Sequence, residues 1–164
     1  MTLKPHTQSP VSGPVGSNPK SRAWARLFVT SSLLVERVEA ALKEAGLPGL
    51  AWYDVLWVLE SSEQGQLRLH ELAARVVVAR YNLTRLADRL ENEGLITRKP
   101  CEEDRRGAWC VITQAGRALR KRMWPIYEAQ VNTCFSDLIT REEAIAMDGA
   151  LEKVRRHLRG EPQP

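Results

Sequence analysis

Two short amphipathic segments stand close together in the middle of the chain, and few folds accommodate that spacing. In both segments apolar residues recur at steps of three and four, which places them on one face of a helix. The first segment carries Leu69, Leu72, Ala73 and Val76, and the second carries Leu83, Leu86, Ala87 and Leu90. Gly94 ends the second segment. Two helices joined by so short a connection are typical of a helix-turn-helix unit.

Two strand-like segments follow directly. Residues 95–101 and 108–113 are rich in β-branched and aromatic side chains, and the charged sequence EEDRRG separates them. This pattern predicts a β-hairpin with a polar tip, which would be a wing. The predicted fold class is therefore mainly α with a small β-hairpin wing, a winged helix-turn-helix domain flanked by N- and C-terminal helices.

Two helices are predicted before the helix-turn-helix unit. From Ala23 to Ala45 apolar residues recur at helical spacing, and Gly46 follows as a helix-ending residue. Residues 50–60 are apolar on nearly every side. We favour a helix there, although the valine and tryptophan content also suits a buried strand.

Two more helices are predicted after the wing. A long helical segment starts at Thr113 and runs to about Ile139, with a kink expected at Pro125. The sequence Thr140-Arg-Glu-Glu143 is a capping box, because the Thr hydroxyl and the Glu carboxylate can each satisfy a free backbone N–H. It opens a last helix to about residue 158.

The chain is predicted to consist of a tail and one domain. Residues 1–20 are rich in proline, glycine and serine, and we expect them to be disordered because they bury too little apolar surface. Residues 21–160 are expected to form a single domain. Its winged helix-turn-helix spans about 50–113, and the flanking helices span about 22–46 and 113–159.

Several classes of protein find no support in the sequence. No apolar run is long enough to span a bilayer, and the N-terminus lacks the apolar stretch of a secretory signal, so we expect a cytoplasmic protein with no membrane partner. The cysteines lack the paired spacing of a zinc site, and no HExxH, GxSxG or P-loop motif is present. We therefore expect neither an enzyme nor a bound cofactor or metal.

Positive charge is concentrated in the predicted winged unit. The whole chain has a net charge of +4, whereas residues 75–122 hold twelve basic and six acidic residues, a local charge of +6. A solvated arginine-rich face would give the same count. The choice between that face and a DNA-binding surface depends on where the side chains point.

The second helix of the pair directs its polar residues away from its apolar face. Arginine can pair with guanine, asparagine with adenine, and threonine with either a base edge or the thymine methyl group in the major groove. Arg75 and Arg89 would contact phosphates, and two arginines at the wing tip would suit the minor groove. The candidate DNA-binding residues are Arg75, Arg80, Tyr81, Asn82, Thr84, Arg85, Arg89, Lys99, Asp104, Arg105 and Arg106.

The sequence resembles the MarR family of regulators over roughly residues 22–158. The motifs that carry the resemblance are RLHELAARV, ARYNLTRLADRLENEGLITRKP and EEDRRGAWCVITQAG, in that order. The resemblance implies that Arg106 enters the minor groove with Asp104 as its orienting partner, and that Thr84 and Arg85 are recognition-helix contacts. The sequence departs from the family at Ala79, often a capping serine, and at Ile112, usually leucine.

The resemblance also implies how the protein works. It implies a homodimer formed through the first and the last two helices, on a pseudopalindromic double-stranded DNA operator, and repression is the family default. Trp124, Tyr127, Phe135 and Leu151 are compatible with a dimer interface.

Members of the family commonly release DNA when they bind a small aromatic or phenolic anion. The candidate effector-binding residues are Trp24, Trp52, Tyr53, Asp54, Trp57 and His70, although aromatic residues at helical spacing also suit a plain core. The pair of Trp24 and Asp54 resembles the urate-responsive branch of the family. We expect Asp54 to pair with Arg80 or Arg75, so that a bound anion would move the recognition helix.

Two other hypotheses stay open. Cys101 and Cys110 lie on the two predicted wing strands, where they could sense redox state, although the family's peroxide sensors carry their reactive cysteine near the N-terminus. Alternatively, a winged helix with an architectural role would bind DNA without selecting a sequence.

Overall fold

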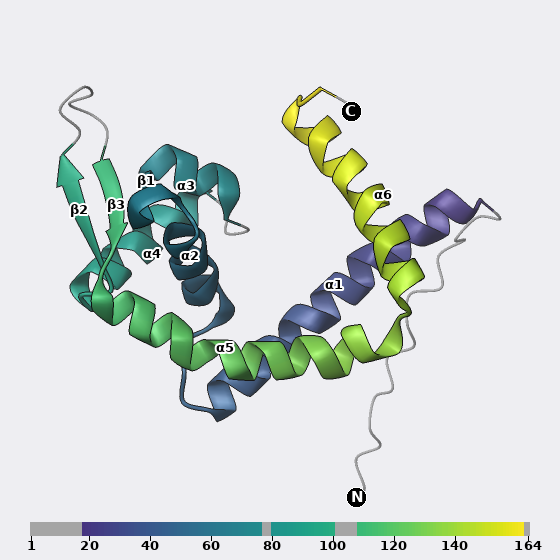
Figure 1. Ribbon diagram of the computed structural model, residues 1–164, viewed down its shortest axis with the longest axis horizontal. Coiled ribbons are helices and arrows are strands. Elements are labelled where there is room, and N and C mark those ends of the chain that lie inside the picture. Colours follow the sequence, from purple (N-terminus) through teal and green to yellow (C-terminus); the bar gives the residue numbers. More distant parts are fainter. Residues whose placement is uncertain (1–17, 77–79, 101–107, 163–164) are drawn as a thin grey trace, which may run out of the picture. The chain divides into compact units, whose positions relative to one another are not determined.

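The computed structural model describes residues 18–76, 80–100 and 108–162, which are mainly helical with one small sheet (Figure 1). The described elements follow in the order α1, α2, a short 3-10 helix, β1, α3, α4, β2, β3, α5, a second 3-10 helix and α6. The chain divides into two compact units, residues 1–36 and residues 37–164. The winged unit lies wholly in the second.

Helix α1 (Pro19–Glu44) corresponds to the first predicted helix and starts inside the stretch assigned to the tail. Proline suits the first turn of a helix, because its φ is fixed near the helical value and its missing N–H would have no partner there. Gly46 follows the helix with a φ of +65°, a left-handed conformation that ends helices at little cost for glycine. Residues 1–17 of the predicted tail lie outside the described part.

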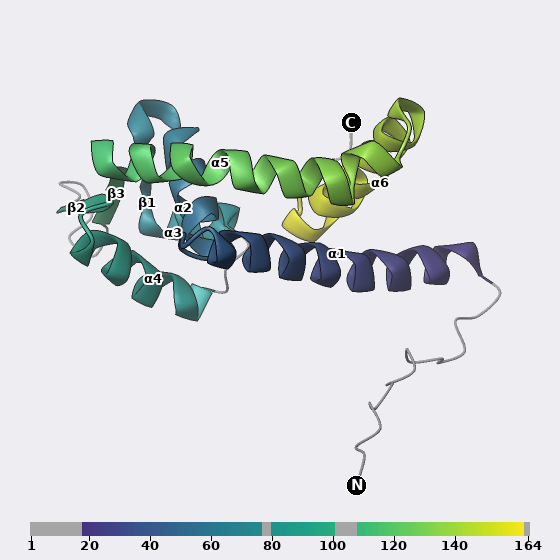
Figure 2. The ribbon, with the colours of Figure 1, turned by 90° about the horizontal axis from the view of Figure 1, so that it is seen from below.

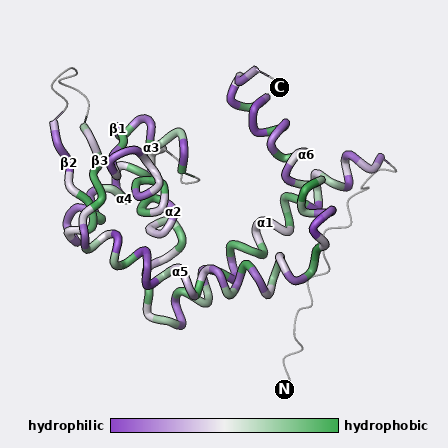
Figure 3. The backbone as a smooth tube through the Cα atoms, in the orientation of Figure 1, coloured by the Kyte–Doolittle hydropathy of each residue, from purple (hydrophilic) through white to green (hydrophobic). Residues whose placement is uncertain are grey.

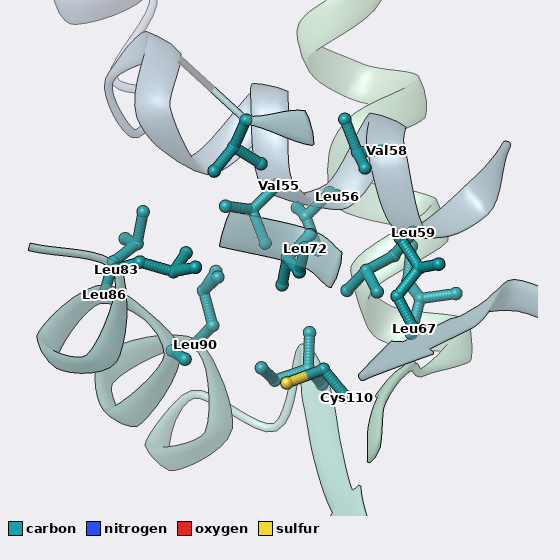
Figure 4. Close-up of a cluster of buried hydrophobic side chains, with 14 of the residues drawn as sticks. Val55, Leu56, Val58, Leu59, Leu67, Leu72, Leu83, Leu86, Leu90 and Cys110 are labelled. Carbon is teal, nitrogen blue, oxygen red and sulfur yellow. The ribbon is translucent and has the colours of Figure 1, made fainter. Parts of the chain in front are cut away.

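Helices α2 (Leu50–Glu60), α3 (Leu69–Arg75) and α4 (Arg80–Asn92) share one apolar core. The favoured prediction of a helix at residues 50–60 is confirmed. Figure 4 shows side chains from these helices meeting Leu67 and Cys110 of the sheet. Burial of one such leucine contributes about 1.5–3 kcal/mol to folding, so the core holds α4 firmly by its apolar face. The fully buried members on the helices include Leu56, Leu59, Leu72 and Leu90.

The sheet contains one strand that the sequence did not predict. Strands β1 (Gln66–Arg68), β2 (Ile96–Pro100) and β3 (Ala108–Ile112) are antiparallel in the order β1-β3-β2. The wing hairpin corresponds to β2 and β3, whereas no strand was predicted at β1. In β1, Leu67 pairs with Cys110 of β3 and is buried. Pairing with a distant strand therefore stabilises a segment too short to show a pattern.

The start of helix α5 (Gln114–Cys134) is fastened to the end of α4. The Thr113 side chain accepts a hydrogen bond from the Gly116 N–H at 3.1 Å and donates one to the Gly94 carbonyl oxygen at 2.7 Å. A Cβ at Gly116 would overlap the carbonyl oxygen of Leu95, so only glycine allows this close approach.

Helix α5 continues past Pro125 and is shorter than predicted. Figure 2 shows α5 as one long helix. It ends at Cys134 rather than near residue 139, because Phe135 leaves the helical region with φ −141° and ψ −63°. A 3-10 turn at Ser136–Leu138 follows. The apolar spacing persists through this turn, and so the sequence pattern did not reveal the break.

Helix α6 (Arg141–Arg159) begins with the predicted capping box. Glu143 donates its backbone N–H to the Thr140 hydroxyl at 3.2 Å, and its carboxylate accepts from the Thr140 N–H at 2.9 Å. At the other end, Arg155 and then Arg156 hold the pKa of Glu152 at about 2, well below its usual value. The capping box satisfies backbone N–H groups at the start of α6, and the ion pairs of Glu152 lie about one turn apart in its C-terminal half.

A second apolar cluster links the C-terminal half of α1 to α2 and α5. It contains Val38, Leu42, Tyr53 and Met123. The Tyr53 ring stacks on Tyr127, with centroids 4.7 Å apart and planes inclined by 15°. Figure 3 shows hydrophobic stretches along these helices as well as inside the winged unit.

Within the described ranges, no helix combines the length and the apolar character needed to cross a membrane.

Candidate nucleic-acid interface

Helix α4 turns a polar face to solvent because its opposite face is held in the core. The buried side is formed by Leu83, Leu86, Ala87 and Leu90. The exposed residues include Asn82, Thr84, Arg85 and Arg89. These four were predicted from helical spacing as DNA contacts, and the structure places all of them on the solvent side of one helix.

Part of this face borders a surface hollow of about 650 Å³. Its polar lining offers an amide, which can donate and accept hydrogen bonds, and guanidinium groups, which donate in a planar fork. Such groups match the edges of bases and the oxygens of phosphates. The hollow is lined by Asn82, Arg85, Leu86, Asp88 and Arg89 of α4 and by Ala51 of α2.

The other predicted DNA-binding residues lie around α4. Arg75 is exposed in the last turn of α3, and Lys99 is exposed on β2. Lys99 pairs with Trp109 of β3, and the guanidinium carbon of Arg68 lies 5.3 Å from the centre of that indole ring. The side chains of Arg80 and Tyr81, and the wing-tip residues Asp104, Arg105 and Arg106, lie outside the described residues.

Sequence reasoning missed Arg98, which reaches the candidate interface from β2. Its Nη2 atom lies 2.6 Å from Oδ1 of Asp88, and its backbone N–H donates to Oε1 of Glu91 at 2.9 Å. Both acidic residues belong to α4. A signal was available in the sequence. Arg98 lies two residues after Ile96, so strand alternation places this charged side chain on the face where an apolar one is expected.

The chain is similar in sequence and fold to known proteins. A sequence profile of the MarR family matches residues 45–107. The transcriptional repressor MprA of Escherichia coli is 30% identical over 127 residues, which cover 77% of this chain and 69% of that protein. AbsC, a MarR family transcriptional regulator from Streptomyces coelicolor, is 31% identical, with a TM-score of 0.77 over 89% of this chain and 99% of that one. This chain belongs to the MarR family.

Membership of the MarR family confirms the predicted resemblance and the winged-helix fold. It also confirms a transcriptional regulator rather than an enzyme. A further MarR family regulator from Streptomyces coelicolor, solved in complex with DNA, has a TM-score of 0.78 and 24% identity. That alignment covers 91% of this chain and 92% of the other, and it supports the fold.

The residues predicted to bind an effector of this MarR family protein have different surroundings. Tyr53 is buried in the stack with Tyr127, whereas Trp52 packs against the core of the winged unit. Trp57 is 48% exposed. Asp54 is partly buried on α2, and His70 is exposed on α3. Trp24 is exposed on the part of α1 in the first unit.

Two of the three cysteines are described, and the one on the wing is inaccessible. Cys110 is fully buried in the core, and Cys134 is partly buried on α5. Burial raises the pKa of the Cys110 thiol, and nearby Arg98 opposes that rise. Since the thiolate is the reactive form, both the raised pKa and the lack of access disfavour oxidation. Cys101, the other cysteine of the redox hypothesis, lies outside the described residues.

We expect Cys110 to react with iodoacetamide at least about 100-fold more slowly in the native protein than in denaturant, because labelling requires local opening of the core. Mass spectrometry of the labelled peptides at pH 8 measures the two rates. Cys134, which is partly exposed, is the internal control and should be labelled faster in the native state. Equal rates for Cys110 in both conditions would favour the redox hypothesis instead.

Proposed function

We propose that this MarR family regulator binds double-stranded DNA with α4 in the major groove and the wing at the flanking minor groove. The observation that carries the proposal is the division of α4 into a buried apolar face and an exposed face bearing Asn82, Thr84, Arg85 and Arg89. Arg75 and Lys99 would contact phosphates beside it. Arg80, Tyr81, Asp104, Arg105 and Arg106 complete the proposed surface, with Arg106 entering the minor groove.

We also propose that the protein acts as a homodimer. Exposed apolar residues lie along α6 at Ile145, Leu151, Val154 and Leu158, and along α1 at Trp24, Phe28, Leu33 and Val35. A soluble monomer rarely leaves so much apolar surface open, and a second copy offers the matching surface. Sedimentation should therefore give twice the 18.5 kDa of one chain. A monomer at micromolar concentration would contradict this part of the proposal.

The DNA-binding proposal is tested by selecting genomic fragments with the purified protein. We expect the enriched fragments to share a pseudopalindrome whose half-sites lie about one helical turn, roughly 10 base pairs, apart. An Arg85→Ala variant processed in parallel should lose this enrichment. Recovery of fragments without any common sequence would instead favour the architectural role.

We further propose that the protein represses transcription and that a small aromatic or phenolic anion releases it from DNA. Two relatives support it: MprA is named a transcriptional repressor, and the structure of BpsR from Bordetella bronchiseptica concerns regulation of its DNA binding by 6-hydroxynicotinic acid. The proposed ligand-responsive residues are Trp24, Trp52, Tyr53, Asp54, Trp57 and His70. In this account Asp54 pairs with Arg80 or Arg75, and the ligand disrupts that pair.

Adding salicylate or urate should lower the affinity of the wild-type protein for a selected fragment, and Asp54→Asn should weaken this response. The control is the affinity of Asp54→Asn without ligand. An unchanged ligand response in Asp54→Asn would show that Asp54 does not mediate the response. If neither compound changes the DNA affinity of the wild type, salicylate and urate are not its effectors.

A further inference from the structure

Arg98 lies on the same face of β2 as the buried Ile96, because side chains two residues apart in a strand point to one side. It pairs across the sheet with the buried Cys110. The side chain therefore leaves the sheet on the core side. Its long stem can cover apolar surface while the guanidinium reaches the rim of α4.

The guanidinium meets three residues on one side of α4. Nη2 lies 2.6 Å from Oδ1 of Asp88 and 3.5 Å from the carbonyl oxygen of Thr84, and Nε lies 3.6 Å from Oε2 of Glu91. The backbone N–H of Arg98 adds a hydrogen bond to Oε1 of Glu91 at 2.9 Å. The three partners are spaced at i, i+4 and i+7, so one residue of β2 holds nearly two turns of α4.

The contacts of Arg98 connect α4 and β2 at a point away from the turn that joins them in sequence. The two elements are joined covalently by the turn at Gly94, whose φ is +69°. Without a second connection this turn would act as a hinge between the helix and the strand that leads to the wing. The pair of Arg98 and Asp88 supplies that second connection, six residues before the turn and four residues after it.

We infer that Arg98 is a positioning residue that braces α4 against β2 and so fixes the angle between the recognition face and the wing. The inference rests on the proposed DNA binding. The exposed face of α4 and the wing must enter adjacent grooves of the DNA at the same time, so their separation has to be fixed. A small misplacement of one surface weakens its contacts when the other is bound, and the affinity for DNA falls.

The brace also changes the charge of the recognition face. Asp88 lines the same hollow as Asn82, Arg85 and Arg89, and its side chain is 50% exposed. An unpaired carboxylate there would repel phosphates, and the charge-assisted contact with Arg98 offsets it. The Arg98 side chain is 25% exposed and its Nη2 is used by Asp88, which favours support of α4 over direct contact with DNA.

The test measures binding of a fragment from the genomic selection and of its scrambled version, each at several salt concentrations. Arg98→Met keeps the length and the apolar stem but removes the charge. We expect Arg98→Met to weaken binding of the selected fragment at least about tenfold, with binding to the scramble changed by less than about twofold and the salt slope unchanged. Arg98→Lys should recover part of the loss.

Two further variants separate positioning from other roles. Asp88→Asn should lower discrimination in the same direction, and the double variant should lose no more than Arg98→Met alone, because both changes remove one interaction. Lys99→Met is the contrasting variant. A direct phosphate contact at this exposed neighbour should weaken both DNAs together and lower the salt slope by about 0.9 for each lysine lost.

Thermal melting first shows which variants are folded at the assay temperature. Unchanged discrimination in Arg98→Met, or a uniform loss with a reduced salt slope, overturns the positioning role while the proposed function stands. If Arg98→Met is unfolded, Arg98→Lys and Asp88→Asn decide by the same criteria. A wild-type protein that binds both DNAs equally overturns the proposed function, and the positioning role fails with it.

Discussion

Replacing Gly116 with alanine is expected to destabilise the protein by about 3 kcal/mol or more, because the new methyl group has no space. An added Cβ would overlap the carbonyl oxygen of Leu95 and come within 2.9 Å of Ile112 and 3.1 Å of Leu56. The carbonyl belongs to the backbone, so it cannot rotate away as a side chain could. The start of α5 would have to separate from the sheet and lose the Thr113 cap.

Thermal or urea unfolding at one fixed protein concentration measures this effect, because the stability of a dimer depends on concentration. For a domain of this size, a loss of about 3 kcal/mol lowers the Tm by roughly 10 °C. Gly149→Ala is the matched control, since this helical glycine has open space around it. That variant should gain about 0.5–1 kcal/mol. A Gly116→Ala variant as stable as the wild type would show that α5 does not approach the sheet so closely.

Replacing Arg85 with alanine is expected to cause the largest loss of sequence recognition. Arg85 is exposed on α4 between Asn82 and Arg89, and a bidentate contact of arginine with guanine is worth about 1–3 kcal/mol. A dimer loses the contact in both half-sites. We therefore expect the affinity for a selected fragment to fall about 30-fold or more, with a smaller effect on scrambled DNA.

Fluorescence anisotropy at constant salt measures both affinities, and Arg122→Ala is the matched control. Arg122 is an exposed arginine on α5, so its removal lowers the net charge by the same amount without altering α4. We expect it to change either affinity by no more than about twofold. Equal losses in the two variants would mean that general charge, rather than the recognition face, controls binding.

The periodic parts of the fold were predictable from the sequence. The spacing of Leu83, Leu86 and Leu90 alone determines which side of α4 is buried, and the exposed residues follow from it. The capping box at Thr140 was also found, because its chemistry is local and depends on residues three positions apart. Patterns of this kind need no knowledge of distant contacts.

The parts that depend on tertiary contacts were missed. Strand β1 has three residues, too few to show alternation, and it is stabilised by pairing with β3, far along the chain, and by burial of Leu67. Arg98 is recognisable as a brace only once β2 is known to lie beside α4. Tyr53 was predicted as an effector contact, and the structure shows it stacked on Tyr127, whereas any role toward a ligand stays a prediction.

The most direct test of the account is an anisotropy titration of the wild-type protein against a genomically selected fragment and a scrambled version of it, at one salt concentration. If α4 recognises the base sequence, the selected fragment should bind at least about 10³-fold more tightly than the scrambled DNA. Equal affinity for the two DNAs would contradict the account, because the exposed polar face of α4 would then contact DNA without reading its sequence.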